Sequence, residues 1–247
     1  MISFLGECIQ NFITTLKYIF SGRAKFGAVI NQAAMISYDS LSISLTIVFI
    51  AAAVISLQVS KQFLMSGAES YVGGFIAVAL VREIAPGFAA LAIGARAGTA
   101  ICAEVANMQV TEQVDAIKTL GVEPVGYYFA PRLLASAFTV PMVVILAEFI
   151  GIVGGMMVAY FAIGLHPNRF MNTVWLLLQA KDIYISIFKA FVFGILITLV
   201  CATQGYKTNG GAKDVGIATT KSAIKSTFYL LVADFIINLL FYVQAGI

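Results

Sequence analysis

Residues 41–59 read LSISLTIVFIAAAVISLQV, a stretch of nineteen residues without a charged side chain. An α-helix needs about 20 predominantly apolar residues to cross the hydrocarbon core of a membrane. This stretch therefore predicts a membrane-spanning helix, and it sets the class of fold expected for the rest of the chain.

The composition of the chain points to the same class. Of its 247 residues, 60% are hydrophobic and 11% are charged, whereas about 25% of the residues of an ordinary soluble domain are charged. Twelve acidic and 15 basic side chains are too few to cover a water-soluble protein of this length. We therefore expect an all-α membrane protein. The basic residues form no dense cluster, which argues against nucleic acid as a partner.

Four further apolar stretches predict four more membrane-spanning helices, making five in all. Pro86 is expected to bend the second helix, and the third is expected to be a single helix, either straight or kinked at Pro141. Lys189 lies close enough to the start of the fourth to extend toward the membrane surface. The four stretches comprise residues 71–108, 133–165, 187–206 and 226–247.

The N-terminal segment, residues 1–25, has a different pattern. Its apolar residues recur every three or four positions and alternate with polar ones, which is typical of an amphipathic helix lying in the membrane interface. The alternative is an ordinary core helix. The apolar positions are Phe4, Leu5, Cys8, Ile9, Phe12, Ile13, Leu16, Ile19 and Phe20.

The distribution of basic residues predicts the orientation, because lysine and arginine concentrate in cytosolic loops. Ten lie before the first span, between the second and third, or between the fourth and fifth, and four lie on the opposite side, one of them near the membrane edge. We therefore expect a cytosolic N-terminus and a C-terminus outside. The ten are Lys17, Arg23, Lys25, Arg96, Lys118, Arg132, Lys207, Lys213, Lys221 and Lys225; the four are Lys61, Arg169, Lys181 and Lys189.

Charged residues inside the spans are the first candidates for function, because each costs at least about 2.5 kcal/mol to insert unless it is paired or hydrated. Arg82 and Glu83 are adjacent, so on a helix they point about 100° apart. They either line a polar cavity or bridge helices, or they form a structural ion pair. Glu148 and Asp234 are isolated carboxylates, for which hydrogen bonding to a neighbouring helix is favoured over a proton path.

The segment from Gln109 to Arg132 predicts a short helix between the second and third spans. Thr111 is expected to be its N-cap, and Gly121 is expected to end it. Val114, Ile117 and Leu120 would form an apolar stripe. Such a helix is suited to docking on another protein, although a simple connector has the same pattern.

Several kinds of chemistry lack the residues they require. Neither a G-x-G-x-x-G motif nor a complete phosphate-binding loop occurs, so any ATP hydrolysis is expected in a partner. The single histidine, His166, is expected in a loop and rules out a histidine-based catalytic or metal site within one chain. The three cysteines lie far apart and are interpreted as apolar fillers. We therefore expect no catalytic residues and no metal ligands.

Three strings resemble the MlaE permease family, which includes the YrbE permeases. The first, residues 82–105, reads REIAPGFAALAIGARAGTAICAEV; it is followed by TEQVDAIKTLGVEP at 111–124 and by APR at 130–132. The resemblance extends from about Leu41 to the C-terminus. Two positions depart from the usual pattern: Gln109 stands where arginine is frequent, and Glu123 precedes Pro124 where aspartate is more usual.

The resemblance implies a single permease domain over residues 1–247, with an interfacial helix at 1–25 and a transmembrane bundle at 41–247. Such permeases are the membrane subunits of ABC transporters that move phospholipid-like lipids in a bacterial inner membrane. The implied partners are a second copy of the chain, a dimer of cytosolic ATPases that binds ATP and Mg²⁺, and an MCE-domain protein. This chain would itself hold no cofactor.

The resemblance also implies which residues contact these partners. Lipid would lie near Gln58, Arg82 and Glu83. The cytosolic coupling helix would contact the ATPase through Thr111, Glu112, Gln113, Asp115, Ala116 and Leu120. The alternative from another class is an ion-coupled secondary transporter that uses Arg82, Glu83, Glu148 and Asp234 as a relay.

Overall fold

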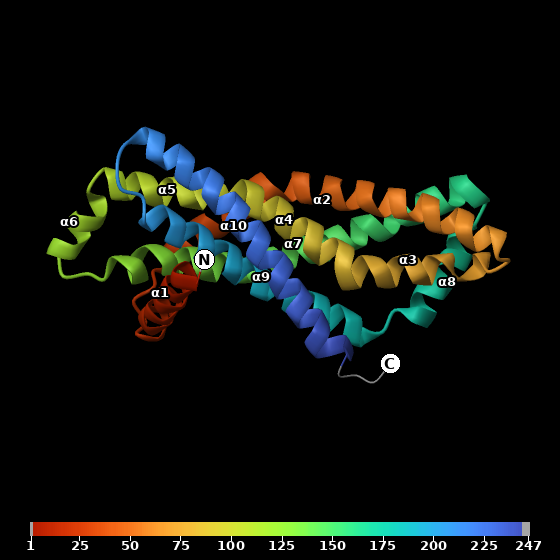
Figure 1. Ribbon diagram of the computed structural model, residues 1–247. Coiled ribbons are helices and arrows are strands. Elements are labelled where there is room, and N and C mark those ends of the chain that lie inside the picture. Colours follow the sequence, from red (N-terminus) through yellow and green to blue (C-terminus); the bar gives the residue numbers. More distant parts are fainter. Residues whose placement is uncertain (1, 244–247) are drawn as a thin grey trace. The chain divides into compact units, whose positions relative to one another are not determined.

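The computed structural model describes residues 2–243, and within this part of the chain every regular element is helical (Figure 1). Five helical segments are long and apolar enough to cross a membrane, as expected. Three short turns, η1 (Glu69–Tyr71), η2 (Leu80–Ile84) and η3 (Gly94–Gly98), lie in the second of these segments and a fourth, η4 (Leu239–Val243), ends the last. The helices are α1 (Ile2–Phe20), α2 (Phe26–Met65), α3 (Val72–Ala79), α4 (Ala85–Ile93), α5 (Thr99–Val110), α6 (Gln113–Thr119), α7 (Pro124–Ile163), α8 (Pro167–Leu177), α9 (Ala180–Tyr206) and α10 (Ala212–Asn238).

The spanning helices are longer than the apolar stretches that predicted them. Helices α2 and α7 each have 40 residues, which corresponds to about 60 Å, roughly twice the thickness of the hydrocarbon core. Helix α9 begins at Ala180 and α10 at Ala212, well before the expected starts at residues 187 and 226. Hydropathy therefore located the spans but not their polar extensions.

The chain divides into two compact units. Unit 1 comprises residues 1–40, 93–140 and 191–236, and unit 2 comprises residues 41–92, 141–190 and 237–247. Several helices, α2, α7 and α9 among them, contribute residues to both units. Each unit is described separately below.

Unit 2 contains a helix that the hydropathy pattern did not predict. Helix α8 packs along α3 (Figure 1), and their contact is close because Gly74 has no side chain: a Cβ there would lie 2.5 Å from the Thr173 carbonyl oxygen. The Thr173 hydroxyl accepts a hydrogen bond from the Gly74 N–H at 3.2 Å. His166, expected in a loop, is the N-cap residue of α8.

In unit 1, α1 packs through a mixed stripe rather than through one purely apolar face. Phe4 and Cys8 are buried in a cluster with residues of α9 and α10. Asn11, a polar residue between the apolar positions of α1, donates a hydrogen bond to the Thr203 hydroxyl at 3.1 Å. Other apolar residues of α1 remain exposed: Leu5, Ile9, Ile13 and Phe20. Burial raises the pKa of the Cys8 thiol, which agrees with its interpretation as an apolar filler.

Candidate substrate and coupling sites

The polar site of unit 2 begins with an irregular turn in the second spanning segment. Arg82 and Glu83 lie in η2, a π-helical turn in which the Ala85 N–H bonds to the Leu80 carbonyl. Pro86 has no N–H, so the Arg82 carbonyl lacks the donor that an α-helix would provide four residues later. Such π-turns are frequent at functional sites. A local change of helix type, from α to π, thus lies directly before Pro86, the residue that was expected to bend this helix.

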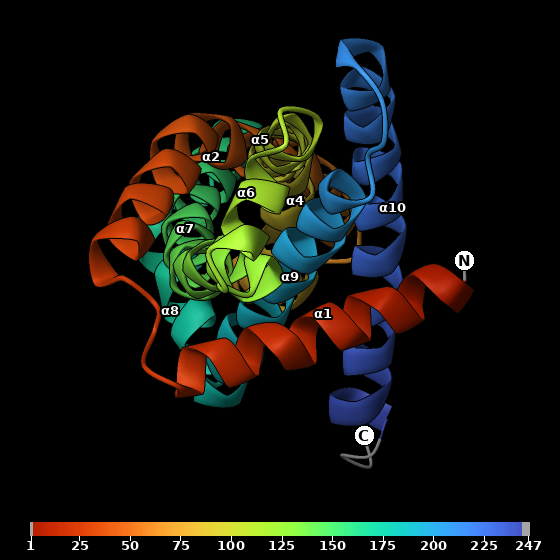
Figure 2. The same cartoon turned by 90° about the vertical axis from the view of Figure 1, so that its left-hand side faces the viewer.

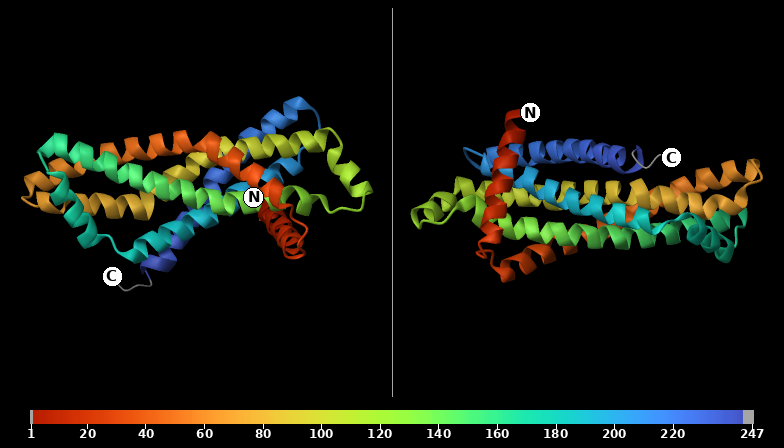
Figure 3. Two further views of the ribbon diagram at one scale, coloured as in Figure 1. Left: turned by 180° about the vertical axis from the view of Figure 1, so that it is seen from behind. Right: turned by 90° about the horizontal axis from the view of Figure 1, so that it is seen from below.

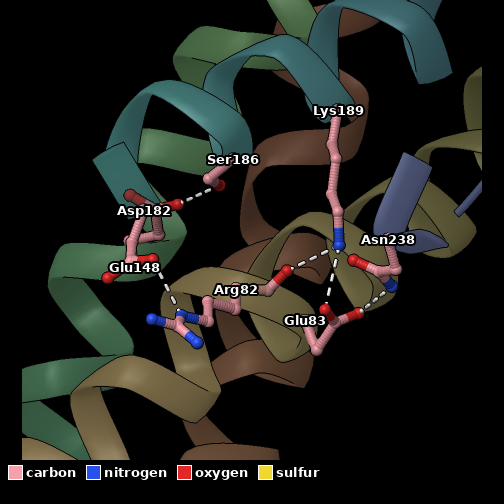
Figure 4. A network of polar contacts seen from close by, with 7 residues as sticks. All are labelled: Arg82, Glu83, Glu148, Asp182, Ser186, Lys189 and Asn238. Carbon is pink, nitrogen blue, oxygen red and sulfur yellow. Dashed lines mark hydrogen bonds and ion pairs between the residues drawn. The ribbon is translucent and has the colours of Figure 1, made fainter. Parts of the chain in front are cut away.

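Lys189 of α9 supplies the missing donor. Its ammonium group donates to the Arg82 carbonyl oxygen at 2.8 Å and forms an ion pair with Glu83 Oε1 at 3.1 Å (Figure 4). The prediction that Lys189 extends toward the membrane surface is wrong, because its side chain is fully buried. Its position far inside α9 follows from the early start of that helix at Ala180.

Arg82 pairs with a carboxylate that the sequence did not single out. Its Nε donates to Asp182 Oδ1 at 2.8 Å, and the other carboxylate oxygen accepts the Gln179 N–H at 3.2 Å. Asp182 lies in the first turn of α9, where a negative charge is stabilised by the helix dipole. Its side chain is 1% exposed, whereas that of Arg82 is 36% exposed. The buried carboxylate therefore orients a guanidinium that remains partly accessible.

Glu83 connects a third helix to this site. Its second oxygen accepts a hydrogen bond from Asn238 Nδ2 of α10 at 2.9 Å. The two acidic residues of the network, Glu83 and Asp182, balance its two cations, Arg82 and Lys189. Arg82 and Glu83 each form an ion pair with α9. Such interhelical pairs agree both with a site that bridges helices and with a structural ion pair that locks the bundle, the two alternatives drawn from the sequence.

Two other candidates of unit 2 lie outside these ion pairs. Glu148 accepts a hydrogen bond from the Ser186 hydroxyl, as expected for a carboxylate bonded to a neighbouring helix. Gln58, implied as a lipid contact, is exposed on α2 and takes no part in the network. Asp234 belongs to unit 1. A group of three acidic, histidine or cysteine side chains able to hold a metal is not found among the described residues.

The partners of Arg82 and Glu83 were missed because each lies at the edge of a predicted span. Asp182 falls before the predicted start of the fourth span at residue 187, and Lys189 was assigned to the end of that span. A signal was available: Asp182 and Lys189 are seven residues apart, about two helical turns, and so share one helix face. Extending the fourth span by two turns places both side chains on that face.

The second candidate site, helix α6, connects α5 to α7 (Figure 3). The prediction of Thr111 as its N-cap is wrong: Thr111 is the C-cap residue of α5, its hydroxyl bonds back to the Asn107 carbonyl, and Glu112 is the N-cap of α6. Glu112 has φ 61°, a left-handed conformation that costs a non-glycine residue about 1 kcal/mol.

The end of α6 agrees with the sequence. Gly121 adopts φ 75°, and its N–H bonds to the Lys118 carbonyl while the Val122 N–H bonds to the Ile117 carbonyl. These two bonds form a Schellman motif, which glycine favours because it tolerates a positive φ.

The expected apolar stripe of α6 is only partly buried. Val114 is fully buried, whereas Leu120 is 78% exposed. All the residues proposed to contact an ATPase are exposed: Thr111, Glu112, Gln113, Asp115, Ala116 and Leu120.

A second buried ion pair lies in unit 1. Arg132 of α7 donates to Glu104 of α5 at 2.8 Å and to the Tyr128 carbonyl at 2.7 Å. Arg132 is 5% exposed, and Arg96 lies in η3. Both residues therefore lie in helical segments rather than in loops, and the orientation drawn from the basic residues stays a prediction.

Five apolar helical segments with charges paired between them define a multi-pass membrane protein. The family model described as Permease MlaE matches residues 29–240. The chain belongs to the MlaE permease family and is an ABC transporter permease subunit.

Named relatives agree with this family. The chain is 32% identical to a probable ABC transporter permease protein of Synechocystis over 93% of this chain and 87% of the relative. A probable ABC transporter permease protein of Rickettsia felis is 34% identical over 87% of this chain and 83% of the relative. The chloroplastic protein TRIGALACTOSYLDIACYLGLYCEROL 1 of Arabidopsis thaliana is 28% identical over 92% of this chain and 65% of the relative.

Proposed function

We propose that the chain is the membrane subunit of an ABC transporter that moves phospholipid-like lipids between a bacterial inner membrane and an MCE-domain partner. Two copies of the chain would form the lipid path, and two cytosolic ATPase subunits would bind and hydrolyse ATP. The observation that carries the proposal is the match to Permease MlaE over residues 29–240. A relative named for trigalactosyldiacylglycerol supports a lipid as the cargo.

Arg82 is the residue we assign to the lipid headgroup. Its guanidinium is partly exposed and is held at Nε by the buried Asp182. A guanidinium presents several N–H donors in a plane, so a group fixed at one edge can still meet a phosphate or carboxylate. Glu83, which is paired with Lys189, would shape the site rather than bind an anionic headgroup.

Helix α6 is the element we assign to the ATPase. Its exposed carboxylates, Glu112 and Asp115, and the exposed Leu120 give it a charged edge and an apolar anchor. Motion of an ATPase dimer would reach the permease through this helix, whose Val114 is fully buried in unit 1. We place α6 and the N-terminus in the cytosol, since the loop lysines and arginines remain concentrated on that side.

The proposal is tested by reconstituting the purified permease, ATPase and MCE-domain protein in proteoliposomes with a fluorescent phospholipid. ATP should drive lipid transfer, whereas a proton or sodium gradient alone should not. Transfer driven by an ion gradient without ATP would contradict the proposal and favour the ion-coupled alternative.

The coupling assignment is tested by copurification of the ATPase in mild detergent. The variant Asp115→Lys should lower its recovery several-fold, because it reverses a charge on the exposed face. Glu112→Gly removes a carboxylate but keeps the left-handed backbone, because glycine tolerates a positive φ. A lower recovery of the ATPase with this variant therefore reports on charge rather than on loop shape. A matched charge reversal away from α6, Glu69→Lys, should leave recovery unchanged. Unchanged recovery with Asp115→Lys would remove α6 from the ATPase interface.

A further inference from the structure

A cavity in unit 1 shares no residue with the Arg82 network and is not explained by it. Its volume is about 300 Å³, and it lies between the turn that follows α1, the start of α2, the end of α5 and the start of α7. All its lining residues belong to unit 1. The turn between α1 and α2 is seen in Figure 2. A cavity of this size is at the lower end of the range for small-ligand sites.

The charge of the lining selects an anion. Three cationic side chains, those of Arg23, Lys25 and Arg132, contribute to the lining, and no carboxylate does. Arg132 is balanced by Glu104, so Arg23 and Lys25 carry the net positive charge. Arg23 and Lys25 form no ion pair within the part of the chain that the structure describes. Tyr18, Tyr127 and Asn31 add neutral hydrogen-bonding groups.

Arg132 is the buried element of this site. Its side chain is 5% exposed. Two of its guanidinium nitrogens donate hydrogen bonds, one to Glu104 and one to the Tyr128 carbonyl. Its Nε has no hydrogen-bond partner among residues 2–243. A buried donor without a partner costs about 1–3 kcal/mol, and an acceptor bound in the cavity would remove that cost.

The cavity is a built feature rather than a gap between loose ends. The ring of Tyr18, near the end of α1, lies directly against Gly126 of α7, where a Cβ would come within 2.5 Å of the ring carbon Cδ2. Glycine at 126 therefore lets α1 close one wall. Tyr128 on the same helix is 7% exposed, so the aromatic wall is fixed by packing.

The surroundings place the cavity at a membrane edge. Met108 and Pro131 are both in its lining. Met108 is the last residue of the predicted apolar stretch 71–108, and Pro131 lies just before the stretch 133–165 begins. Large apolar side chains within two residues of lining residues in the sequence are exposed: Phe20 at 85%, Phe26 at 77% and Ile30 at 53%. Cationic donors next to exposed apolar side chains match a ligand that has a phosphate head and acyl chains.

We propose that this cavity binds the headgroup phosphate of an anionic phospholipid in the leaflet on the N-terminal side of α2. Arg23 and Lys25 supply the charge, the Arg132 Nε–H supplies a buried donor, and the exposed apolar residues contact the acyl chains. The bound lipid ties the turn between α1 and α2 to α7. The proposal requires only that the chain lies in a membrane, and it holds whatever cargo the transporter carries.

The test is a lipid titration of the detergent-purified full-length protein, in complex with its partner subunits, followed by native mass spectrometry. Phosphatidylglycerol should bind at least about 10-fold more tightly than phosphatidylcholine, because a net negative headgroup meets two unpaired cations. Inorganic phosphate is the second arm and should not displace the lipid at equal concentration. Equal affinity for the two lipids, or displacement by inorganic phosphate, would overturn the proposal.

Variants locate the site. Arg23→Gln should weaken phosphatidylglycerol binding about 5-fold, and Arg23→Gln with Lys25→Gln about 25-fold. The matched control removes two exposed cations outside the lining, Lys17→Gln with Lys213→Gln, and should retain wild-type affinity. Equal weakening by both double variants would show that binding follows overall charge, and would overturn the assignment.

A second variant addresses the cavity without changing charge. Ala28→Leu places a larger side chain in the lining and should lower phosphatidylglycerol affinity while leaving the thermal unfolding midpoint of the lipid-free protein within error. Wild-type affinity in this variant would place the lipid elsewhere and overturn the proposal.

Discussion

Two arginine–carboxylate pairs of equal length differ in which partner is buried. Arg82 and Asp182, in unit 2, and Arg132 and Glu104, in unit 1, are each 2.8 Å apart. In the first pair the carboxylate is 1% exposed and the guanidinium 36%; in the second the guanidinium is 5% exposed and the carboxylate 31%. The first pair therefore presents a cation to its surroundings, and the second presents an anion.

This difference has energetic consequences. Removing one partner of a buried pair is costly mainly because it leaves the other charge uncompensated. A buried carboxyl group can take up a proton and become neutral, whereas a guanidinium keeps its charge in proteins. Loss of the exposed partner should therefore cost more in the Arg132 pair than in the Arg82 pair, although the distances are the same.

The largest effect on stability is expected for Glu104→Gln. It leaves the buried guanidinium of Arg132 without a counter-charge, and we expect the free energy of unfolding to fall by about 3 kcal/mol. Denaturant unfolding in detergent measures this loss. The control is Glu7→Gln, since the pair between Glu7 and Lys207 is about 40% exposed on both sides and should contribute less than about 1 kcal/mol. Equal losses in the two variants would contradict the role of burial.

Arg82→Met should have the next largest effect, about 2 kcal/mol at neutral pH. Asp182 would be left buried with the Gln179 N–H as its remaining partner. Because the loss comes from an uncompensated carboxylate, the cost of Arg82→Met should shrink in an Asp182→Asn background. Denaturant unfolding of the two single variants and the double variant tests this, and additive losses would contradict it.

A smaller effect is expected from the coupling between Pro86 and Lys189. Pro86→Ala restores the N–H that can bond to the Arg82 carbonyl, so Lys189 loses part of its role. In a double-mutant cycle with Lys189→Met, the cost of losing Lys189 should be about 1 kcal/mol smaller in the Pro86→Ala background. Additive effects would show that Lys189 does not replace the missing helix donor.

The smallest effect on stability is expected in α6, where charges are solvated. The hydrogen bond from Lys118 to Asp115 raises the pKa of the Lys118 ammonium above its ordinary value of 10.5. The ammonium is charged at pH 7 with or without this bond, and the small stabilisation disappears only as the pH rises through the raised value. Because both side chains of this pair are exposed to solvent, its contribution at pH 7 is small. Asp115→Asn should leave the unfolding midpoint at pH 7 within error, and a clear drop would show that α6 is held by this pair.

Local sequence signals predicted local features well. The apolar stretch at 41–59 located α2, and Gly121 marked the end of α6, because span length and a left-handed glycine are properties of a few consecutive residues. Pro86 likewise marked a perturbed helix. In these cases the deciding interactions form within one segment.

Features that depend on two distant segments were not predicted. Lys189 was assigned to a helix end because its partners, Glu83 and the Arg82 carbonyl, are more than 100 residues away. Arg132 was counted as a loop charge because the third span was predicted to start at residue 133, whereas α7 begins at Pro124. Helix α8 was missed because its first turn is polar and its apolar residues are too few to mark a span. Such contacts are determined by tertiary packing, and a hydropathy profile along the sequence carries no information about tertiary packing.

The central claim is that the chain moves lipid, and that the guanidinium presented by Arg82 takes part in doing so. The most direct measurement is ATP-driven phospholipid transfer by the reconstituted complex containing Arg82→Lys, Arg82→Met or wild-type permease. Arg82→Met should lower the transfer rate at least about 10-fold with normal complex assembly, and Arg82→Lys should restore part of it, since the charge remains but the planar donors do not. Transfer at the wild-type rate by a fully assembled Arg82→Met complex would contradict the claim.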